Sequence, residues 1–397
     1  YLLRKCGLEQ NILVQYEELN EKKAVSDVGL TVKKEKAYLK DNDEVPDVSI
    51  WNRLCNLRQY DLKYYDDIIE KIVRGEKIEY VPTEYKVYER EESSEKVRRL
   101  VSLSAKDRVI TTNLALRLCS KMKINWKSFS YHISYTSQER IFYYWYSSWG
   151  KFIDHIRVFT EIPFMDNYEA FYIDLKGFYD HIDFVSVFRS FENFLDEETK
   201  NIFVFLTEFN DILMKKLQNG RRIGVPQGPA YARIIAEMFL NQLLESMCQQ
   251  FKNSGFYMYR YVDDIVFFCE PDFDGKAMYD YLIGTLPSAG LPINYDKTKY
   301  FGKISSINDE DRRELLHQDS FNYELKENEY TGILVEEERR KKLKNYLMKN
   351  PFNVGSLGYI FGTNTFSEAQ SWCLDYYRED ILKSCNGRGS NFRKFYE

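Results

Sequence analysis

The stretch Met258-Tyr-Arg-Tyr-Val-Asp-Asp-Ile-Val-Phe-Phe268 is an apolar run interrupted at its centre by two adjacent carboxylates. The residues on either side of the interruption predict two short strands, and a tight turn between them places Asp263 and Asp264 at the tip of a hairpin. Buried like charges are costly unless cations neutralise them. The pair is therefore either an ordinary Asp-rich turn or part of a metal site, and a single Asp-Asp pair does not decide between these.

A second segment, Phe171-Tyr-Ile-Asp-Leu-Lys-Gly-Phe-Tyr-Asp180, supplies a third carboxylate. Asp174 ends a predicted apolar strand, so its side chain lies beside the hairpin tip if the two strands are neighbours. Two Mg²⁺ ions about 4 Å apart need bridging carboxylates from separate strands, and Mg²⁺ prefers oxygen ligands. Asp174 and Asp263 are the expected bridging pair, with Asp264 beside them.

The composition is that of a soluble globular protein, with 44% hydrophobic and 29% charged residues. A length of 397 residues allows two or three domains. Aromatic residues reach 16%, and most are expected in the core, although stacking on bases is the alternative. The formal net charge of −5 is not that of a uniformly basic nucleic-acid-binding protein, so any basic surface has to be local.

Two basic clusters are candidates for that surface. One is the run at 339–344, which follows three glutamates and is equally compatible with a solvated helix face. The other lies nearer the start of the chain and consists of Lys96, Arg98, Arg99, Lys106 and Arg108.

Periodicity divides the chain into four parts. Residues 1–95 form an N-terminal helical lobe with a helix from Tyr60 to Gly75, and residues 96–166 hold a strand followed by a helix from Arg108 to Met122. Residues 167–303 alternate strands and helices, with a helical insertion at about 190–222, and residues 304–397 are polar and helical.

The third part decides the fold class. Strands are predicted at Ala170 to Asp174, within Tyr257 to Phe268, and at Leu291 to Tyr295. The pattern predicts an α+β fold in which helices cover one face of a sheet.

Seven scattered cysteines with no C-x-x-C pair argue against a disulfide framework or a zinc site. They favour a reducing, cytoplasmic setting. No apolar run approaches the roughly 20 residues that span a bilayer, so no membrane association is expected.

Taken in order, these segments resemble the motifs of reverse transcriptases, whose palm carries an Asp at a strand end and, later, a Tyr-x-Asp-Asp hairpin. Tyr261-Val-Asp-Asp264 matches that hairpin. The segment Ile223-Gly-Val-Pro-Gln-Gly-Pro-Ala-Tyr-Ala-Arg-Ile-Ile-Ala-Glu237 resembles the Pro-Gln-Gly motif that leads into a helix. Gly290-Leu-Pro-Ile-Asn-Tyr-Asp-Lys-Thr-Lys299 is similar to the Leu-x-Leu-Asn-x-x-Lys-Thr element. The resemblance covers about residues 95–303.

This resemblance implies a right-hand polymerase. Its fingers would be 96–166, its ferredoxin-like antiparallel palm 167–303, and its helical thumb or C-terminal helical domain 304–397. The implied activity is RNA-directed DNA polymerisation with two Mg²⁺ ions, which are held by Asp174, Asp263, Asp264 and the backbone carbonyl of Leu175.

The resemblance also implies nucleotide-binding roles. Tyr179 would be a steric gate that excludes a 2′-hydroxyl, with a core aromatic as the alternative reading. Gln227 and Gly228 would lie against the incoming nucleotide and the template base. Lys297 would face the pyrophosphate, unless it is a solvated lysine at a strand end. The triphosphate would be clamped by Arg98, Arg99, Lys106 and Arg108.

One departure concerns subtype. Many reverse transcriptases have Ser-Pro where this chain has Ala232-Arg233, and Gly-Pro-x-x-x-Arg-x-x-Ala-Glu is similar to the abortive-infection reverse transcriptases of bacterial antiviral defence. That similarity implies dNTP substrates and a DNA product, made on an RNA template or an associated non-coding RNA, or without a template from a protein hydroxyl. A homo-oligomer in the bacterial cytoplasm fits it.

Two other functions remain open. An RNA-dependent RNA polymerase shares the palm but usually has Gly-Asp-Asp in the hairpin, which Tyr261 and Tyr179 argue against. A non-catalytic nucleic-acid-binding scaffold that keeps the palm fold is the second, and the intact carboxylate triad argues against it.

Overall fold

The computed structural model describes residues 27–316, with gaps at 42–47, 84, 94–95, 123–127, 135–136, 138, 144, 193–194, 218–222 and 252–254. The basic run at 339–344 and most of the predicted C-terminal part lie outside the described residues. Within them, no helix combines the length and the hydropathy needed to cross a membrane.

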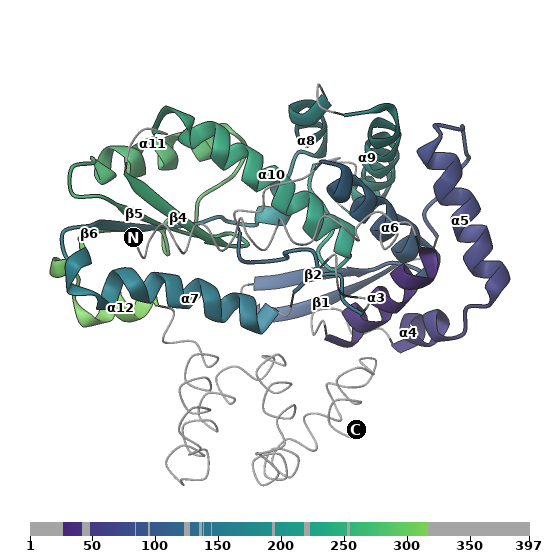
Figure 1. Ribbon diagram of the computed structural model, residues 1–397, viewed down its shortest axis with the longest axis horizontal. Coiled ribbons are helices and arrows are strands. Elements are labelled where there is room, and N and C mark those ends of the chain that lie inside the picture. The colour runs from purple at the N-terminus through teal and green to yellow at the C-terminus, as the bar shows by residue number, and fades with distance from the viewer. Residues whose placement is uncertain are drawn as a thin grey trace, which may run out of the picture.

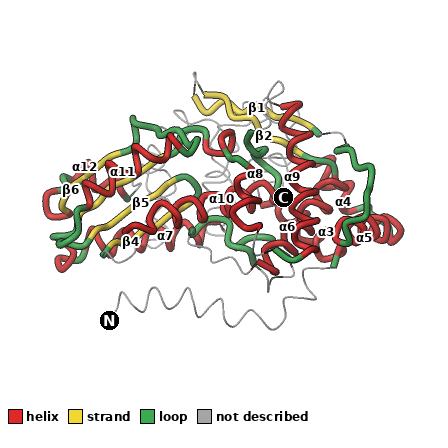
Figure 2. Tube along the Cα trace, turned by 90° about the horizontal axis from the view of Figure 1, so that it is seen from above, coloured by secondary structure: helices red, strands yellow, loops and turns green. Residues whose placement is uncertain are grey.

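A bundle of helices forms one end of the molecule (Figure 2). Its centre is α6 (Ala105–Met122), which is buried on nearly all sides because α3 (Val28–Asp41), α4 (Val48–Cys55), α5 (Gln59–Val73) and α9 (Glu197–Leu217) pack around it. The helices predicted at Tyr60 to Gly75 and at Arg108 to Met122 are confirmed as α5 and α6. A two-stranded antiparallel hairpin, β1 (Lys86–Ser93) and β2 (Lys96–Ser102), leads into α6.

A four-stranded antiparallel sheet forms the other end. Its strands lie in the order β4-β5-β3-β6, and their bounds are Phe256–Tyr261, Asp264–Cys269, Glu169–Asp174 and Lys299–Lys303. Between β3 and β4 the chain forms α8 (Phe184–Phe191), α9 and α10 (Ala230–Cys248), and between β5 and β6 it forms α11 (Gly275–Ser288). This β-α-β-β-α-β succession is ferredoxin-like, and the predicted α+β class is confirmed.

Helices cover both faces of this sheet, so the prediction that they cover one face is wrong. Side chains alternate along a strand. Phe171 and Phe267 therefore share one face with α10 and α11, while Tyr172 and Phe268 share the other face with α7 (Trp145–Glu161). Figure 1 shows α11 and α7 on opposite sides of the strands. β3 and β5 are apolar on both faces, which is the pattern of a strand buried on both sides.

The strand predicted at Leu291 to Tyr295 is also wrong. There the chain makes a single antiparallel bridge, between Ile293 and Leu175, and the edge strand β6 begins only at Lys299. Pro292 has no N–H to give to a ladder, so the segment cannot continue as a regular strand.

The remaining elements are short. They are α12 (Asp309–Leu315) and the 3₁₀ turns η1 (Pro163–Met165), η2 (Phe178–His181), η4 (Gln249–Phe251) and η5 (Ile304–Ser306).

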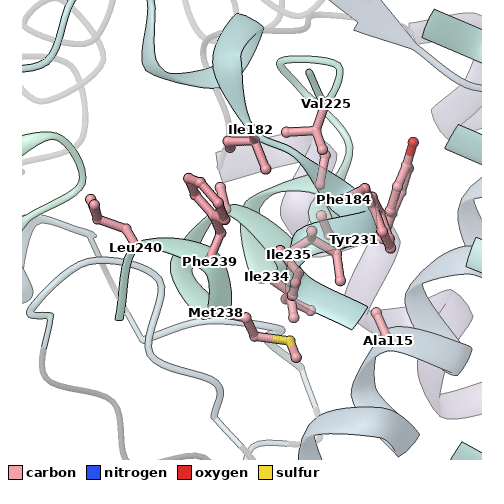
Figure 3. Packing of buried hydrophobic residues seen from close by; sticks show 14 of the residues in the cluster. Ala115, Ile182, Phe184, Val225, Tyr231, Ile234, Ile235, Met238, Phe239 and Leu240 are labelled. Atoms are coloured by element: carbon pink, nitrogen blue, oxygen red, sulfur yellow. The ribbon is translucent and has the colours of Figure 1, made fainter. Parts of the chain in front are cut away.

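The largest hydrophobic cluster is centred on α10, where Tyr231 and Ile235 are fully buried. Ala115 of α6 lies on one side of this helix, and Ile182 and Val225 of the loops that follow β3 and α9 lie on another (Figure 3). Because α10 touches both ends of the molecule, it fixes the loop before it between the helical bundle and the sheet.

Candidate active site

The three predicted carboxylates meet at one edge of the sheet. Asp174 is the last residue of β3 and lies opposite Asp264, the first residue of β5. Tyr261 pairs with Asp264, so the hairpin turn consists of Val262 and Asp263. Opposite residues of an antiparallel pair have Cα atoms about 4.5–5.5 Å apart. Segments far apart in sequence thus bring Asp174, Asp263 and Asp264 together, although Asp264 belongs to the strand and not to the turn.

Asp174 is hydrogen-bonded to Asn294 and Thr298, which lie in the loop before β6. Its Oδ2 accepts a hydrogen bond from Asn294 Nδ2 at 2.6 Å, and its carbonyl accepts one from the Asn294 N–H at 2.9 Å. Its own N–H donates to Thr298 Oγ1 at 3.1 Å. Only 7% of Asp174 is exposed, so these bonds set the direction of a nearly buried carboxylate.

Asp264 has a different partner, the Tyr172 hydroxyl, which donates to its Oδ1. Burial raises the pKa of Asp264 to about 6, the Tyr172 bond opposes that rise, the nearby Asp174 adds to it, and Lys297 opposes it. Burial and the Asp264 carboxylate in turn raise the pKa of Tyr172, so its hydroxyl keeps its proton. The edge of the sheet thus carries negative charge that a cation would stabilise.

The donor set suits Mg²⁺, because it consists of carboxylate and carbonyl oxygens. Among the described residues no three His, Cys, Asp or Glu side chains form a ready metal-binding group as they stand. Two of the three carboxylates point at side-chain donors, Asn294 and Tyr172, with which a cation would compete. The isolated β-bridge between Leu175 and Ile293 has two hydrogen bonds, whose acceptors are the carbonyls of Asp174 and Pro292. The Leu175 carbonyl takes part in neither of these bonds.

The loop before α10 lies against the turn that carries Tyr179. Val225 N–H donates to the Tyr179 carbonyl at 2.8 Å, and Gly224 N–H donates to the Ile182 carbonyl at 2.9 Å. The Tyr179 ring is half-buried and packs against the main core cluster. The structure therefore brings Tyr179 next to the Pro-Gln-Gly segment.

Gln227 and Gly228 join this loop to the rest of the molecule. The Gln227 carbonyl accepts from the Val101 N–H of β2 at 2.7 Å, while its side-chain Oε1 is buried and makes no hydrogen bond. Gly228 has a φ of 120°, a backbone conformation that side chains disfavour, and its carbonyl accepts from the Tyr38 hydroxyl at 2.8 Å.

The basic residues do not all lie together. Lys297 is exposed, and its charge acts on Asp264. Arg99 is exposed on β2, and its charge acts on Asp180, close to Tyr179. Lys106 lies over the Tyr80 ring at 4.5 Å.

Two other members of the cluster at 96–108 differ from these, and the side chain of the fifth member, Lys96, lies outside the described residues. Arg108 is 1% exposed and forms an ion pair with Glu35 at 3.2 Å, which places it in the core of the bundle. Arg98 belongs to β2, and its side chain lies outside the described residues.

Sequence reasoning missed Tyr172, Arg260 and Glu237, all of which bear on the carboxylates. Tyr172 carried a signal, because residues i and i+2 of a strand share a face, so it had to lie beside Asp174. The signal for Arg260 was weaker and consisted of a charged residue inside an otherwise uncharged strand. Glu237 ends the Gly-Pro-x-x-x-Arg-x-x-Ala-Glu pattern, but nothing local indicated its contact with Arg260.

Comparison with known proteins adds one match. A family model described as reverse transcriptase (RNA-dependent DNA polymerase) matches residues 91–333. No curated protein matches the chain. The matched range contains the whole sheet, α6 and the loop before α10, and it excludes α3, α4 and α5.

Proposed function

The chain belongs to the reverse transcriptase family of RNA-directed DNA polymerases, and from that premise we propose that it adds dNTPs to a hydroxyl at the sheet edge formed by β3 and β5. The observation that carries this proposal is the cross-strand pairing of Asp174 with Asp264, with Asp263 in the adjoining turn. A polymerase needs carboxylates from separate strands at one place, and this register supplies them.

The chain's own residues divide the work as follows. Asp174, Asp263, Asp264 and the Leu175 carbonyl would hold two Mg²⁺ ions, which when bound would lower the pKa of the attacking hydroxyl and stabilise the pyrophosphate. Lys297, exposed beside Asp264, meets the leaving pyrophosphate.

The nucleotide binds beside Tyr179 and the Pro-Gln-Gly loop, which lie against each other. The hydrogen bond from Val225 to the Tyr179 carbonyl fixes the backbone of the gate, so the half-buried ring restricts the space for a 2′-hydroxyl. Gln227 and Gly228 face the nucleotide and the template base. Triphosphate binding is assigned to Arg99, Lys106 and Arg98, and Arg108 is left out because Glu35 neutralises it in the core.

In this proposal β2 and α6 belong to the fingers, the four-stranded sheet is the palm, and the thumb begins after β6. Residues 1–95 are a separate N-terminal lobe. The Gly-Pro-x-x-x-Arg pattern at Gly228 to Arg233 supports a role in bacterial antiviral defence. The template is then an associated non-coding RNA, or none is used and a protein hydroxyl is the primer.

The test is dNTP incorporation by the purified full chain with Mg²⁺. Asp263→Ala and Asp264→Ala are expected to reduce incorporation to background, because each removes a metal ligand. Asp280→Ala is the control, since this exposed carboxylate on α11 pairs only with Lys276 on the same helix among the ion pairs described. Incorporation that persists in the Asp263 and Asp264 variants would refute the proposal.

Two further measurements separate the alternatives. Comparing rNTP with dNTP incorporation distinguishes an RNA polymerase, and Tyr179→Ala is expected to admit rNTPs if the ring is the gate. Calorimetric Mg²⁺ titration of the wild type against Asp263→Ala distinguishes a scaffold, which would show no difference between them.

A further inference from the structure

The turn that carries Asp263 has an unusual backbone. Val262 has a φ of 55°, and among the described residues the only other non-glycine with positive φ is Tyr131. A β-branched side chain in this left-handed region is strained and persists only where the surroundings enforce it. Because Val262 directly precedes Asp263 and Asp264, the groups that enforce its conformation also direct those carboxylates.

Both polar backbone groups of Val262 are held by side chains. Its N–H donates to Ser130 Oγ at 2.8 Å, and its carbonyl accepts from Arg260 Nη1 at 2.9 Å. Ser130 and Arg260 are each 0% exposed, so water does not compete for these bonds.

One carboxylate ties the two supports together. Glu237 Oε1 accepts from Ser130 Oγ at 2.6 Å, and Glu237 Oε2 accepts from Arg260 Nη2 at 2.7 Å. Arg260 Nη2 also donates to Asn241 Oδ1 at 2.7 Å. Glu237 and Asn241 are one turn apart on α10, so this largely buried helix anchors the turn that carries Asp263.

We propose that Glu237 and Arg260 are positioning residues for nucleotide addition, which hold Val262 in its left-handed conformation and thereby aim Asp263 and Asp264 at the metals. This inference rests on the proposed function. The pair touches neither substrate nor metal, and it acts only through the turn.

The competing explanation is that the pair merely stabilises the fold, because breaking a buried ion pair leaves a buried charge. The chain offers a matched control for that explanation. Glu35 and Arg108 form a second buried Arg–Glu pair, 0% and 1% exposed, in the helical bundle and away from the turn.

The experiment compares Glu237→Gln with Glu35→Gln in the full chain. The measurements are kcat and KM for dNTP, expressed per folded molecule by circular dichroism, and Mn²⁺ binding by electron paramagnetic resonance without nucleotide. Glu237→Gln is expected to lower kcat about tenfold or more and to weaken Mn²⁺ binding, since the strained residue is released. Its KM for dNTP is expected to stay near the wild-type value, and Glu35→Gln is expected to leave all three values near wild type.

A rescue variant separates positioning from stability. Glycine adopts positive φ without strain, so Val262→Gly in the Glu237→Gln background is expected to recover part of kcat and of Mn²⁺ binding. It is not expected to recover the melting temperature. If Glu237→Gln does not fold, Ser130→Ala takes its place, because it removes the acceptor of the Val262 N–H and leaves the Arg260–Glu237 pair intact.

Wild-type kcat and Mn²⁺ binding in Glu237→Gln or, where that variant does not fold, in Ser130→Ala would overturn the inference. The inference would also be overturned if Glu237→Gln and Glu35→Gln lost kcat and Mn²⁺ binding equally and Val262→Gly did not restore them. If the wild type itself incorporates no nucleotide, the proposed function fails instead, and Mn²⁺ binding still reports on the positioning.

Discussion

Tyr172→Phe removes one hydroxyl from the candidate active site and leaves the aromatic ring in place. The hydroxyl donates to Asp264 Oδ1, and the ring is 6% exposed and packs in the cluster beneath α7. The substitution therefore changes the electrostatics of Asp264 while the packing of the sheet face is preserved.

The size of the effect follows from that hydrogen bond. A hydrogen bond to a charged group contributes about 1.5–3 kcal/mol. The Tyr172 bond lowers the pKa of Asp264, so its loss moves that pKa further above about 6. One pKa unit corresponds to about 1.4 kcal/mol, so the lower limit is a shift of about one unit.

The sign of the change in metal binding depends on pH. At pH 8 Asp264 is ionised with or without the hydroxyl, so the variant's carboxylate, free of a competing donor, binds Mg²⁺ more tightly, by about tenfold for 1.4 kcal/mol. At pH 6 the variant's Asp264 is largely protonated, and this advantage disappears or reverses. Without metal, the raised pKa means that the neutral form of Asp264 stabilises the folded state. This contribution to the free energy of unfolding is present below about pH 4 and is lost as the pH rises through about 6.

The assay is the Mg²⁺ concentration that gives half-maximal dNTP incorporation, measured at pH 8 and at pH 6, with Mn²⁺ binding as a second readout. Tyr257→Phe is the control, because its hydroxyl lies on the same sheet face but donates to Glu270 at 3.3 Å. A Mg²⁺ midpoint that is unchanged in Tyr172→Phe at both pH values would refute the reasoning.

Three further outcomes are expected. Asn294→Ala removes the 2.6 Å bond that directs the Asp174 carboxylate and should lower kcat about tenfold, given about 1.5 kcal/mol for a charged hydrogen bond, although it also removes a donor that competes with the cation; an unchanged steady-state kcat would contradict the role of this loop. Burial lowers the pKa of His132 to about 4, so the unfolding free energy should fall as the pH drops from 6.5 toward 4, and urea titrations of His132→Asn should show a smaller fall than those of the wild type. Phe159→Ala should cost about 3–5 kcal/mol in the same titrations, because this ring stacks on Phe268 at 4.2 Å; a loss below about 1 kcal/mol would mean that α7 does not stabilise the sheet.

The sequence was sufficient to predict that Asp174 lies beside the Asp263-Asp264 hairpin if the two strands pair. An apolar strand that ends in Asp174 and a hairpin that breaks at Asp263 are local patterns, and pairing the two strands is the simplest way to bury both. The position of Asp264 at the start of β5 depends on the length of the hairpin turn, which could not be predicted from the sequence.

The errors arose where the deciding interaction lies far away in the chain. Pro292 is a local signal against a strand. The same loop also donates a hydrogen bond from Asn294 to Asp174, which lies more than a hundred residues earlier in the chain. Arg99 and Arg108 look alike in sequence. Arg108 lies in the core, where it pairs with Glu35 of α3, and no local pattern near Arg108 predicts that contact.

The departure at Ala232-Arg233 has a structural explanation of the same kind. The Arg233 guanidinium lies over the Tyr131 ring at 4.5 Å and the Tyr38 ring at 5.7 Å, and it is nearly buried. A buried guanidinium is stabilised by aromatic faces, and α3 supplies one of them through Tyr38. The Tyr38 hydroxyl also donates to the Gly228 carbonyl in the Pro-Gln-Gly loop. Since α3 precedes the range that the family model matches, a helix from outside that range contacts both Arg233 and the Pro-Gln-Gly loop.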